Sequence, residues 1–401
     1  MVSGRLMTND STCVRGMFAG RPHRGPPAQG CEYRLCRLGR PFRLRKFGKL
    51  RGVFVARRAN GPKRFCYVAR NGEPTPRSPS RPRTMPPNRL LIRRCDPANE
   101  VAPLALAAQG WDEAERPALW KTVRRAALEA PQSVILLAAE HESGLVAAQV
   151  AQIFPGRVAL TWPIQWVDPS GPTANPDGTI FVIRSFENEL TDCLFDAGCV
   201  FVQALTPPSD QYSSQALSLQ GFMPMAQLVY LVDELGSQVE MKTGGELTWV
   251  DMEPHDESRL ARVIERTYVG TQDCPWLDRW RTTADVLAGY RAVGRYDPAF
   301  WKIARHGADD VGCVLVNVHE DVHHAELVYL GLVPEARGRG WAVELVDRAR
   351  QLAREAGCQR MVLAVDDANE PAKRLYARCG MEEFGRRQLW IHPVLRRGDG
   401  T

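Results

Sequence analysis

From residue 88 onward, apolar positions recur with the two-residue period of strands and the 3.6-residue period of helices. In the first part the pattern predicts a short helix between 206 and 225, helices at 117–130 and 186–198, and strands at 89–94, 133–140, 144–154, 157–167, 200–205 and 226–234. A stretch rich in Pro, Gly, Asn and Asp predicts a long loop at 168–178.

The same order of elements returns in the second part of the chain. It begins near 246–254, with helices predicted at Glu257–Tyr268, at Thr283–Val293, after residue 340 and at 369–380, and strands at 300–306, 312–320, 325–333, 360–365 and 387–393. Ala-Gly-Cys occurs at 197–199 and again 159 residues later at 356–358, and Gly221 and Gly380 keep the same offset. A constant offset over matching elements indicates a duplicated unit.

The helix predicted after residue 340 has a single apolar face. Its apolar residues follow a 3.6-residue period, and Gly357 ends the pattern: Ala342, Leu345, Val346, Ala349, Leu352, Ala353 and Ala356. The helix therefore begins within the sequence RGRGWA, where its first N–H groups have no partner inside the helix.

That turn has the properties of a site for a bulky anion. Gly338 and Gly340 allow close backbone approach, while Arg337 and Arg339 add positive charge beside the helix dipole. The spacing matches neither a P-loop nor a dinucleotide-binding motif. Taken alone, the turn is equally compatible with an ordinary loop.

A second motif lies one strand later. Asn369 is a good helix cap, and Tyr376 falls two turns further on the same helix face. The competing interpretation is that Tyr376 is only an aromatic residue of the core. Its position beside an anion site makes that interpretation less favourable.

Composition limits the class of protein. A chain of 401 residues with 44% hydrophobic and 24% charged residues is typical of a soluble protein of two domains. No apolar run is long enough to span a membrane. The 11 cysteines lack metal-ligand spacing, and His323–His324 is an isolated pair, so we expect reduced thiols, no metal and a cytoplasmic location.

Residues 1–87 differ sharply from the rest. They hold 20 Lys and Arg against 3 Asp and Glu, and they are rich in Pro and Gly. Such a composition predicts a disordered basic arm. Met85 as the physiological start is an alternative, as is a transit peptide, although this arm is long for one. We expect nucleic acid as a partner only if the arm is genuine.

The two motifs together resemble those of the GCN5-related N-acetyltransferase (GNAT) family. Its Gln/Arg-x-x-Gly-x-Gly/Ala signature is matched by Arg337-Gly338-Arg339-Gly340-Trp341-Ala342, and its Asn-Ala-Tyr pattern by Asn369, Ala372 and Tyr376. The resemblance covers 245–401, and 88–240 resembles a degenerate copy, as in tandem members of the family. It implies an α/β (α+β) fold of two GNAT-like domains, each a mixed, mostly antiparallel splayed sheet flanked by helices.

The resemblance also implies acetyl-coenzyme A as cosubstrate, bound without a metal. Backbone N–H groups of the signature would hold the pyrophosphate, and the strand backbone at Leu330, Leu332 and Val333 would follow the pantetheine arm. Asn369 would bind the pantetheine end, and Tyr376 would lie near the sulfur. The implied binding residues are Leu330, Leu332, Val333, Arg337, Gly338, Arg339, Gly340, Trp341, Ala342, Asn369 and Tyr376.

The implied reaction is direct transfer of an acetyl group to an amine in a ternary complex. Tyr376 is the candidate acid for the leaving thiolate, and Glu326 the candidate base, with Glu320 and His324 as rivals. For Glu326, an exposed strand residue is the competing interpretation. The acceptor, a small-molecule or peptide amine, is not identified by the sequence, and a non-catalytic acyl-coenzyme A sensor or scaffold is the alternative function.

The first half lacks the equivalent residues. At the offset of 159, Asn369 corresponds to Asp210 and Tyr376 to Leu217, while Arg337, Gly340 and Ala342 correspond to Gly178, Phe181 and Ile183. Large side chains at a helix start would block a diphosphate. We therefore expect that the first half does not bind coenzyme A productively.

Overall fold

The computed structural model describes residues 90–168, 176–236, 245–253, 257–277, 280–320 and 323–395. By their contacts, all of these residues belong to one compact unit. The predicted basic arm at 1–87 lies outside the described residues. Within the described part of the chain, no helix is both long and apolar enough to cross a membrane.

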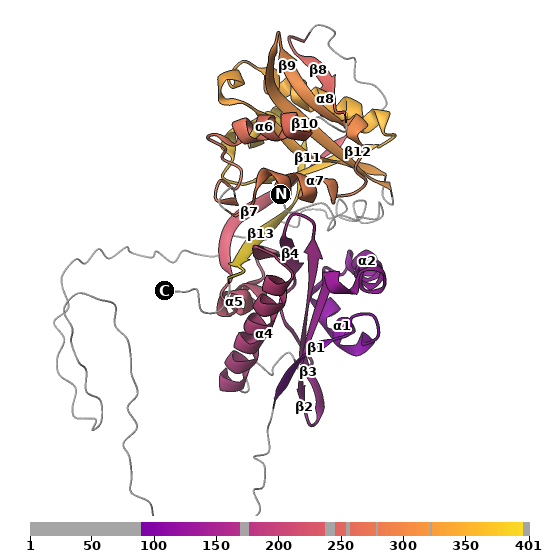
Figure 1. Ribbon diagram of the computed structural model, residues 1–401, viewed down its shortest axis with the longest axis vertical. Helices are drawn as coiled ribbons and strands as arrows, with labels where there is room; N and C mark the ends of the chain where they lie inside the picture. The colour runs from indigo at the N-terminus through magenta and orange to yellow at the C-terminus, as the bar shows by residue number, and fades with distance from the viewer. Residues whose placement is uncertain are drawn as a thin grey trace, which may run out of the picture. The chain divides into compact units, whose positions relative to one another are not determined.

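The described residues of the first half form seven strands and four α-helices (Figure 1). The strands are β1 Leu91–Cys95, β2 Val134–His141, β3 Gly144–Phe154, β4 Val158–Thr161, β5 Gln165–Trp166, β6 Phe201–Thr206 and β7 Met223–Glu234. The helices are α1 Val101–Ala107, α2 Arg116–Glu129, α4 Pro176–Asp196 and α5 Gln211–Leu219.

The described residues of the second half repeat this order with six strands. Its strands are β8 Thr248–Asp251, β9 Trp301–His306, β10 Asp309–His319, β11 His324–Leu332, β12 Arg360–Asp366 and β13 Glu382–Pro393. Its helices are α6 Glu257–Tyr268, α7 Thr283–Arg291, α8 Trp341–Glu355 and α9 Glu370–Arg378. The predicted repetition of elements is therefore confirmed, and the fold is the mixed α/β type that the resemblance implied.

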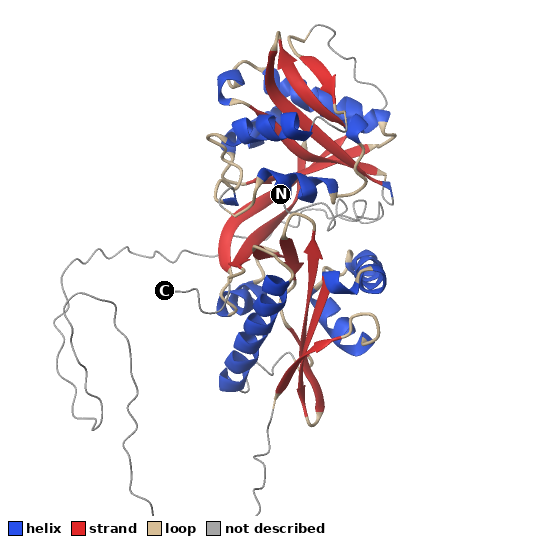
Figure 2. Ribbon diagram, viewed as in Figure 1, coloured by secondary structure: helices blue, strands red, loops and turns tan. Residues whose placement is uncertain are grey.

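The last strand of each half lies in the sheet of the other half. The strands follow the order β1-β2-β3-β4-β6-β13-β7-β12-β11-β10-β9-β8, with β5 paired to β3 off this path. Strand β7 pairs with β12, β13 pairs with β6, and β7 and β13 pair with each other in antiparallel fashion. Figure 2 shows these two long strands linking the halves. Neither half of the sequence, 88–240 or 245–401, therefore completes its sheet with its own last strand.

Helices cover both faces of the sheet in each half. In the second half, α8 and α9 pack on one face through a cluster that includes Val346, Leu352 and Leu375. Helices α6 and α7 cover the other face with Leu260, Ile264 and Leu287. The regular apolar spacing of α8 in the sequence is the spacing of its buried residues, as predicted.

Three elements of the first half differ from the predictions. Helix α1 was not predicted, because its seven residues are too few for a clear period. Helix α4 begins at Pro176, ten residues before the predicted start, since a proline fits the first position of a helix. The single strand predicted at 157–167 is two strands, β4 and β5, separated by a segment that contains Pro163, which has no N–H to donate.

Candidate active site

A cavity opens where strands β11 and β12 separate. The two strands pair in parallel only from His324 to Glu326 against Arg360 to Val362. Beyond these residues the strands diverge, and a cavity of about 590 Å³ lies between them and the N-termini of α8 and α9. The splayed sheet implied by the resemblance is thus present, and it provides a slot with free strand backbone along its walls.

A β-bulge in β11 lies at the beginning of this slot. The register against β10 shifts so that Leu315 pairs with Tyr329 but Val316 pairs with Leu327, which leaves Val328 as the extra residue. As a result Val328 and Tyr329 both pack towards α6 and α7, while Leu327 packs towards α8 and α9. A bulge bends the strand and interrupts regular pairing, which assists the opening of the slot.

The glycine turn lies at the phosphate end expected for the slot. Gly338 and Gly340 line the cavity and have φ of +78° and +86°, and Gly340 is the N-cap of α8. A Cβ atom built on either glycine meets no protein atom within 4 Å. Their conformation thus requires glycine, and the space above them is open. The turn therefore fits a bulky anion at the positive end of α8.

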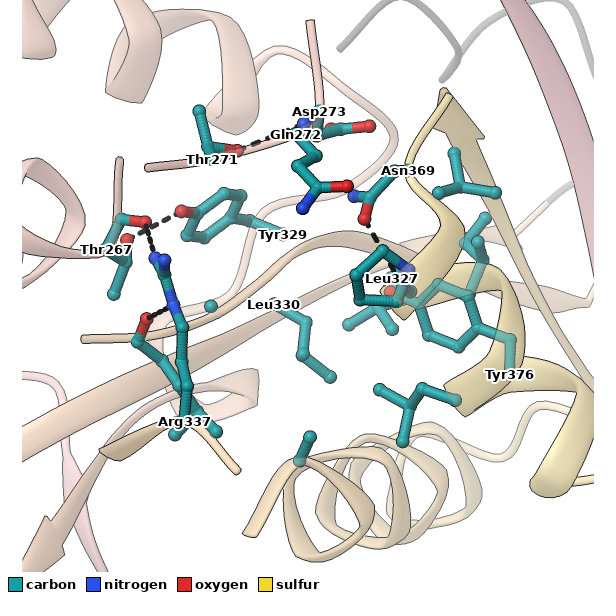
Figure 3. A pocket seen from close by; sticks show the side chains of 18 of the residues that line it. Thr267, Thr271, Gln272, Asp273, Leu327, Tyr329, Leu330, Arg337, Asn369 and Tyr376 are labelled. Atoms are coloured by element: carbon teal, nitrogen blue, oxygen red, sulfur yellow. Dashed lines mark hydrogen bonds between the residues drawn. The ribbon is translucent and has the colours of Figure 1, made fainter. Parts of the chain in front are cut away.

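Arg337 supports the turn by binding backbone carbonyl groups. Its Nε donates to the carbonyl of Leu332 at 3.1 Å, and its guanidinium also donates to Thr267 at 2.8 Å and Gly270 at 3.4 Å (Figure 3). The side chain of Arg337 thus links the end of β11 to the end of α6. Its positive charge lies beside the turn, and its guanidinium is hydrogen-bonded to these carbonyl groups.

We predict that Arg337→Lys lowers the free energy of unfolding by about 1 to 2 kcal/mol, because a single ammonium cannot reproduce three hydrogen bonds from a planar fork. Urea denaturation measures the change. Arg374→Lys is the control, since Arg374 makes only an exposed ion pair with Glu370 at 3.8 Å; an equal effect of both substitutions would contradict the anchoring role.

The structure divides the predicted binding residues into two groups. Eight of them line the cavity: Leu330, Leu332, Arg337, Gly338, Gly340, Ala342, Asn369 and Tyr376. Val333 and Trp341 are instead buried in a core cluster, where the indole of Trp341 donates to Glu246 at 3.1 Å. Arg339 stacks over Trp341 with its guanidinium carbon 5.0 Å from the ring centroid. The side chains of Val333, Arg339 and Trp341 therefore lie outside the lining.

Asn369, the N-cap of α9, and Tyr376, within α9, both line the cavity. The Oδ1 atom of Asn369 accepts from the N–H of Ala372 at 3.2 Å and so caps the helix. In Figure 3 Asn369 is at the end of the cavity away from Arg337. Burial, with a smaller contribution from Asp273, raises the pKa of Tyr376 well above its usual value. The phenol therefore stays protonated at neutral pH and is able to donate a proton.

None of the three predicted bases lines the cavity. Glu326 is buried with its Oε2 atom 2.9 Å from Nε2 of His319. Glu320 is exposed and forms an ion pair of 2.7 Å with Arg295. His324 is buried, and its Nε2 atom has no hydrogen-bond partner among the described residues. The prediction that one of them acts as the base gains no support from this placement.

His324 gives the fold a predicted sensitivity to acid. Burial, followed by the nearby His319, lowers the pKa of His324 from 6.5 to about 4. The folded state thus holds the neutral imidazole, and its contribution to stability is complete above pH 6.5 and is lost as the pH falls towards 4. We predict that His324→Leu reduces the loss of unfolding free energy between pH 7 and 4.5 by about 2 to 3 kcal/mol. Urea titrations at both pH values measure this change, with His141→Leu as control; an unchanged pH dependence in His324→Leu would contradict it.

The loop between α6 and α7 completes the site. This α6–α7 loop, residues 269–282, contributes Gly270, Thr271, Gln272 and Asp273 to the cavity. Oδ1 of Asp273 accepts from the N–H of Asp366 at 3.0 Å, and Oδ2 of Asp366 accepts from the N–H of Cys274 at 3.2 Å. These reciprocal bonds fix the loop to the end of β12. The local sequence gave no signal for this contact, because it joins residues more than ninety positions apart.

The predicted comparison of the two glycine turns was wrong. The first paired residues of β4 and β11 are Val158 and His324, 166 positions apart, whereas those of β6 and β12, Phe201 and Arg360, are 159 apart. The longer helix α4 causes this change of offset. Phe181 and Ile183 consequently lie inside α4, whereas Gly178 lies in its first turn, and the segment before α4, 169–175, is outside the described residues.

The comparison of the two later helices does hold. Asp210 caps α5 by accepting from the N–H of Ser213 at 3.0 Å, as Asn369 caps α9, and Leu217 is fully buried at the position of Tyr376. The first half therefore has no hydroxyl at the position of the candidate acid. That it does not bind coenzyme A stays a prediction.

Among the described residues, no group of three or more His, Cys, Asp or Glu side chains could hold a metal ion.

Comparison with known proteins agrees with this geometry. Residues 262–381 match the acetyltransferase (GNAT) family. The N-alpha-acetyltransferase MAK3 of Arabidopsis thaliana is 26% identical over 136 residues, which cover 32% of this chain and 72% of that protein. The mycothiol acetyltransferase of Thermomonospora curvata is 30% identical over 129 residues, covering 32% of this chain and 41% of that protein.

A solved structure extends the likeness of fold to both halves. The GCN5-related N-acetyltransferase from Sphaerobacter thermophilus superposes with a TM-score of 0.52 at 19% identity, covering 77% of this chain and 97% of that one. Because 77% of this chain is more than either half contains, the superposition includes residues of both halves. The family match at 262–381, together with the splayed strands and the glycine turn, identifies a GNAT acetyltransferase domain in the second half of the chain.

Proposed function

We propose that this protein transfers an acetyl group from acetyl-coenzyme A to an amine, by direct attack in a ternary complex. One observation carries the proposal: the slot between β11 and β12 joins the open glycine turn of α8 to the buried hydroxyl-bearing ring of Tyr376. A diphosphate site and a proton donor are thus connected by one continuous cavity. This is the arrangement that a thioester with a long, flexible arm requires.

The cavity fits acetyl-coenzyme A in its chemistry. The empty space above Gly338 and Gly340 suits the diphosphate, which the N–H groups at the start of α8 would hold. The strand backbone of Leu330 and Leu332 would bind the amide groups of the pantetheine arm. The amide of Asn369 lies at the opposite end of the cavity in Figure 3, close to the expected position of the thioester.

Bound acetyl-coenzyme A would supply the activated acetyl group, and the protein would supply position and proton transfer. The slot fixes the thioester so that an amine reaches it from one direction, which removes much of the entropic barrier. A backbone N–H of β11 near the bulge would stabilise the oxyanion. Tyr376, held protonated by burial, would donate to the departing sulfur.

The test is release of free thiol from acetyl-coenzyme A by the purified full chain, measured across a broad panel of amines. Amine-dependent release, with the acetylated amine identified by mass spectrometry, supports the enzyme. Tight binding of acetyl-coenzyme A without thiol release for any amine would instead indicate the acyl-coenzyme A sensor. Absence of binding would overturn both functions.

A further inference from the structure

A second, smaller cavity adjoins the first one. It has a volume of about 260 Å³ and lies between α6, α7 and the α6–α7 loop. Three residues line both cavities, namely Thr271, Asp273 and Tyr329. A molecule in the second cavity would therefore have one end at Asp273, beside the slot for the thioester. The volume suits a metabolite rather than a folded partner.

The end of this cavity nearest the slot carries a carboxylate in an unusual setting. Asp273 is partly buried and is held by the N–H of Asp366 at 3.0 Å. Burial is the main cause that raises the pKa of its carboxyl group, so it is a stronger base than an exposed aspartate. The next residue, Cys274, has the left-handed φ of +46° that is uncommon outside glycine. A backbone held in such a conformation often serves to aim a functional group.

An arginine lines the same cavity. The Nε atom of Arg281 is buried and has no hydrogen-bond partner among the described residues. The guanidinium lies over Phe201, with its carbon 5.6 Å from the ring centroid, and no ion pair neutralises it within the described part of the chain. A buried guanidinium donor without an acceptor is costly, and a carboxylate is its natural partner.

The wall between these charges is aromatic and fixed. The hydroxyl groups of Tyr268 and Tyr290 lie 2.9 Å apart, and the ring of Tyr290 stacks on Tyr329 at 5.6 Å. The hydroxyl of Tyr329 in turn pairs with Thr267 at 2.6 Å. Because each of these tyrosine hydroxyl groups already has a hydrogen-bond partner, the wall offers ring surface to a ligand, which favours an apolar side chain.

We propose that the second cavity binds the acceptor and that this acceptor is a free amino acid. The ammonium group lies at Asp273, the carboxylate at Arg281, and the side chain along the tyrosines. This rests on the proposed acetyl transfer. Glu265 also lines the cavity, and its Oε1 atom accepts from the hydroxyl group of Thr283 at 2.6 Å. Unlike an amine alone, a zwitterion pairs with both Asp273 and Arg281, and a peptide bond at the carboxyl end would remove the charge that Arg281 binds.

The proposed step balances in atoms and protons. The ammonium gives one proton to Asp273, and its nitrogen then forms the new bond to the carbonyl carbon of the acetyl group. The bond from that carbon to sulfur breaks, and the sulfur takes the proton of Tyr376. The nitrogen's surplus proton returns to Tyr376, and Asp273 releases its own proton to solvent. Asp273 is thus the catalytic base of the proposal.

The experiment compares free amino acids with their carboxamides, as matched pairs, in the thiol-release assay with the full chain. For the preferred side chain, we expect kcat/KM for the free acid to exceed that for the amide by about 10- to 100-fold. Arg281→Gln is expected to lower kcat/KM for the free acid but not for the amide, so that the preference falls to within about 3-fold. Asp273→Asn is expected to lower kcat for acid and amide alike by about 100-fold.

Arg295→Gln is the matched control, because Arg295 pairs with Asp297 and Glu320 away from both cavities. Binding of acetyl-coenzyme A to each variant shows that the fold and the slot are intact. Amides or dipeptides that react as fast as the free acids would overturn the amino-acid assignment while leaving acetyl transfer in place. Thiol release from no amine at all, with acetyl-coenzyme A still bound, would overturn the proposed function itself.

Discussion

Gly340→Val is expected to weaken binding of acetyl-coenzyme A by at least about 100-fold, which corresponds to the loss of one or two charge-assisted hydrogen bonds. Gly340 has a φ of +86°, and the space above its Cα atom is open. A valine there would fill the space that we assign to the diphosphate and would move the first N–H groups of α8. Isothermal titration calorimetry measures the affinity directly.

Gly357→Val is a close control for this substitution. Gly357 follows the other end of α8, has a φ of +78°, and likewise has no protein atom within 4 Å of a built Cβ. It does not line the cavity. Both variants incur similar backbone strain, so both should lose stability while only Gly340→Val loses affinity. Unchanged affinity in Gly340→Val would remove the turn from the binding site.

Tyr376→Phe is expected to lower kcat by about 10²- to 10³-fold while KM for acetyl-coenzyme A changes little. The substitution keeps the buried ring, so the packing of α9 is preserved and only the proton donor is lost. Burial keeps the pKa of Tyr376 far above the assay range. The defect should consequently be the same at every pH between 6 and 9, which steady-state kinetics over that range would show.

Tyr296→Phe is the control for loss of a phenol hydroxyl elsewhere in the same half. The ring of Tyr296 packs edge-on against Trp301 at 4.6 Å, away from the lining of both cavities. Its turnover should remain close to that of the unaltered protein. A fully active Tyr376→Phe would show that the sulfur takes its proton from another source, such as water in the slot.

Much of the candidate site could be predicted from short stretches of sequence. The start of α8 followed from its apolar period, and the conformation of Gly338 and Gly340 followed from the need for a tight turn at that start. The capping role of Asn369 and the inward position of Tyr376 likewise depend on neighbours within about two turns of helix. Local patterns sufficed because each feature is determined by residues close in sequence.

The candidate base could not be found in the same way. Glu326 was proposed because it lies on the strand beside the slot, but side chains alternate along a strand and a bulge changes which face each one reaches. Asp273 lies in a loop without periodicity, and its place is fixed by Asp366 on a distant strand. The comparison of the two glycine turns failed for a similar reason. The longer helix α4 changes the offset between the halves, but the sequence patterns on either side of that helix do not reveal the change.

The sequence by itself determined the repeated order of elements, the start of α8, the cap of α9 and the residues that form the glycine turn. Only the tertiary structure decided which strand closes which sheet, where the slot opens and which carboxylate faces it. The physical reason lies in the range of the interactions. Helices and turns are set by neighbours in sequence, whereas the sheets that β7 and β13 join are set by pairing with β12 and β6, which lie far away in the sequence. Their exchange, and the position of Asp273, depend on long-range pairing that no local pattern encodes.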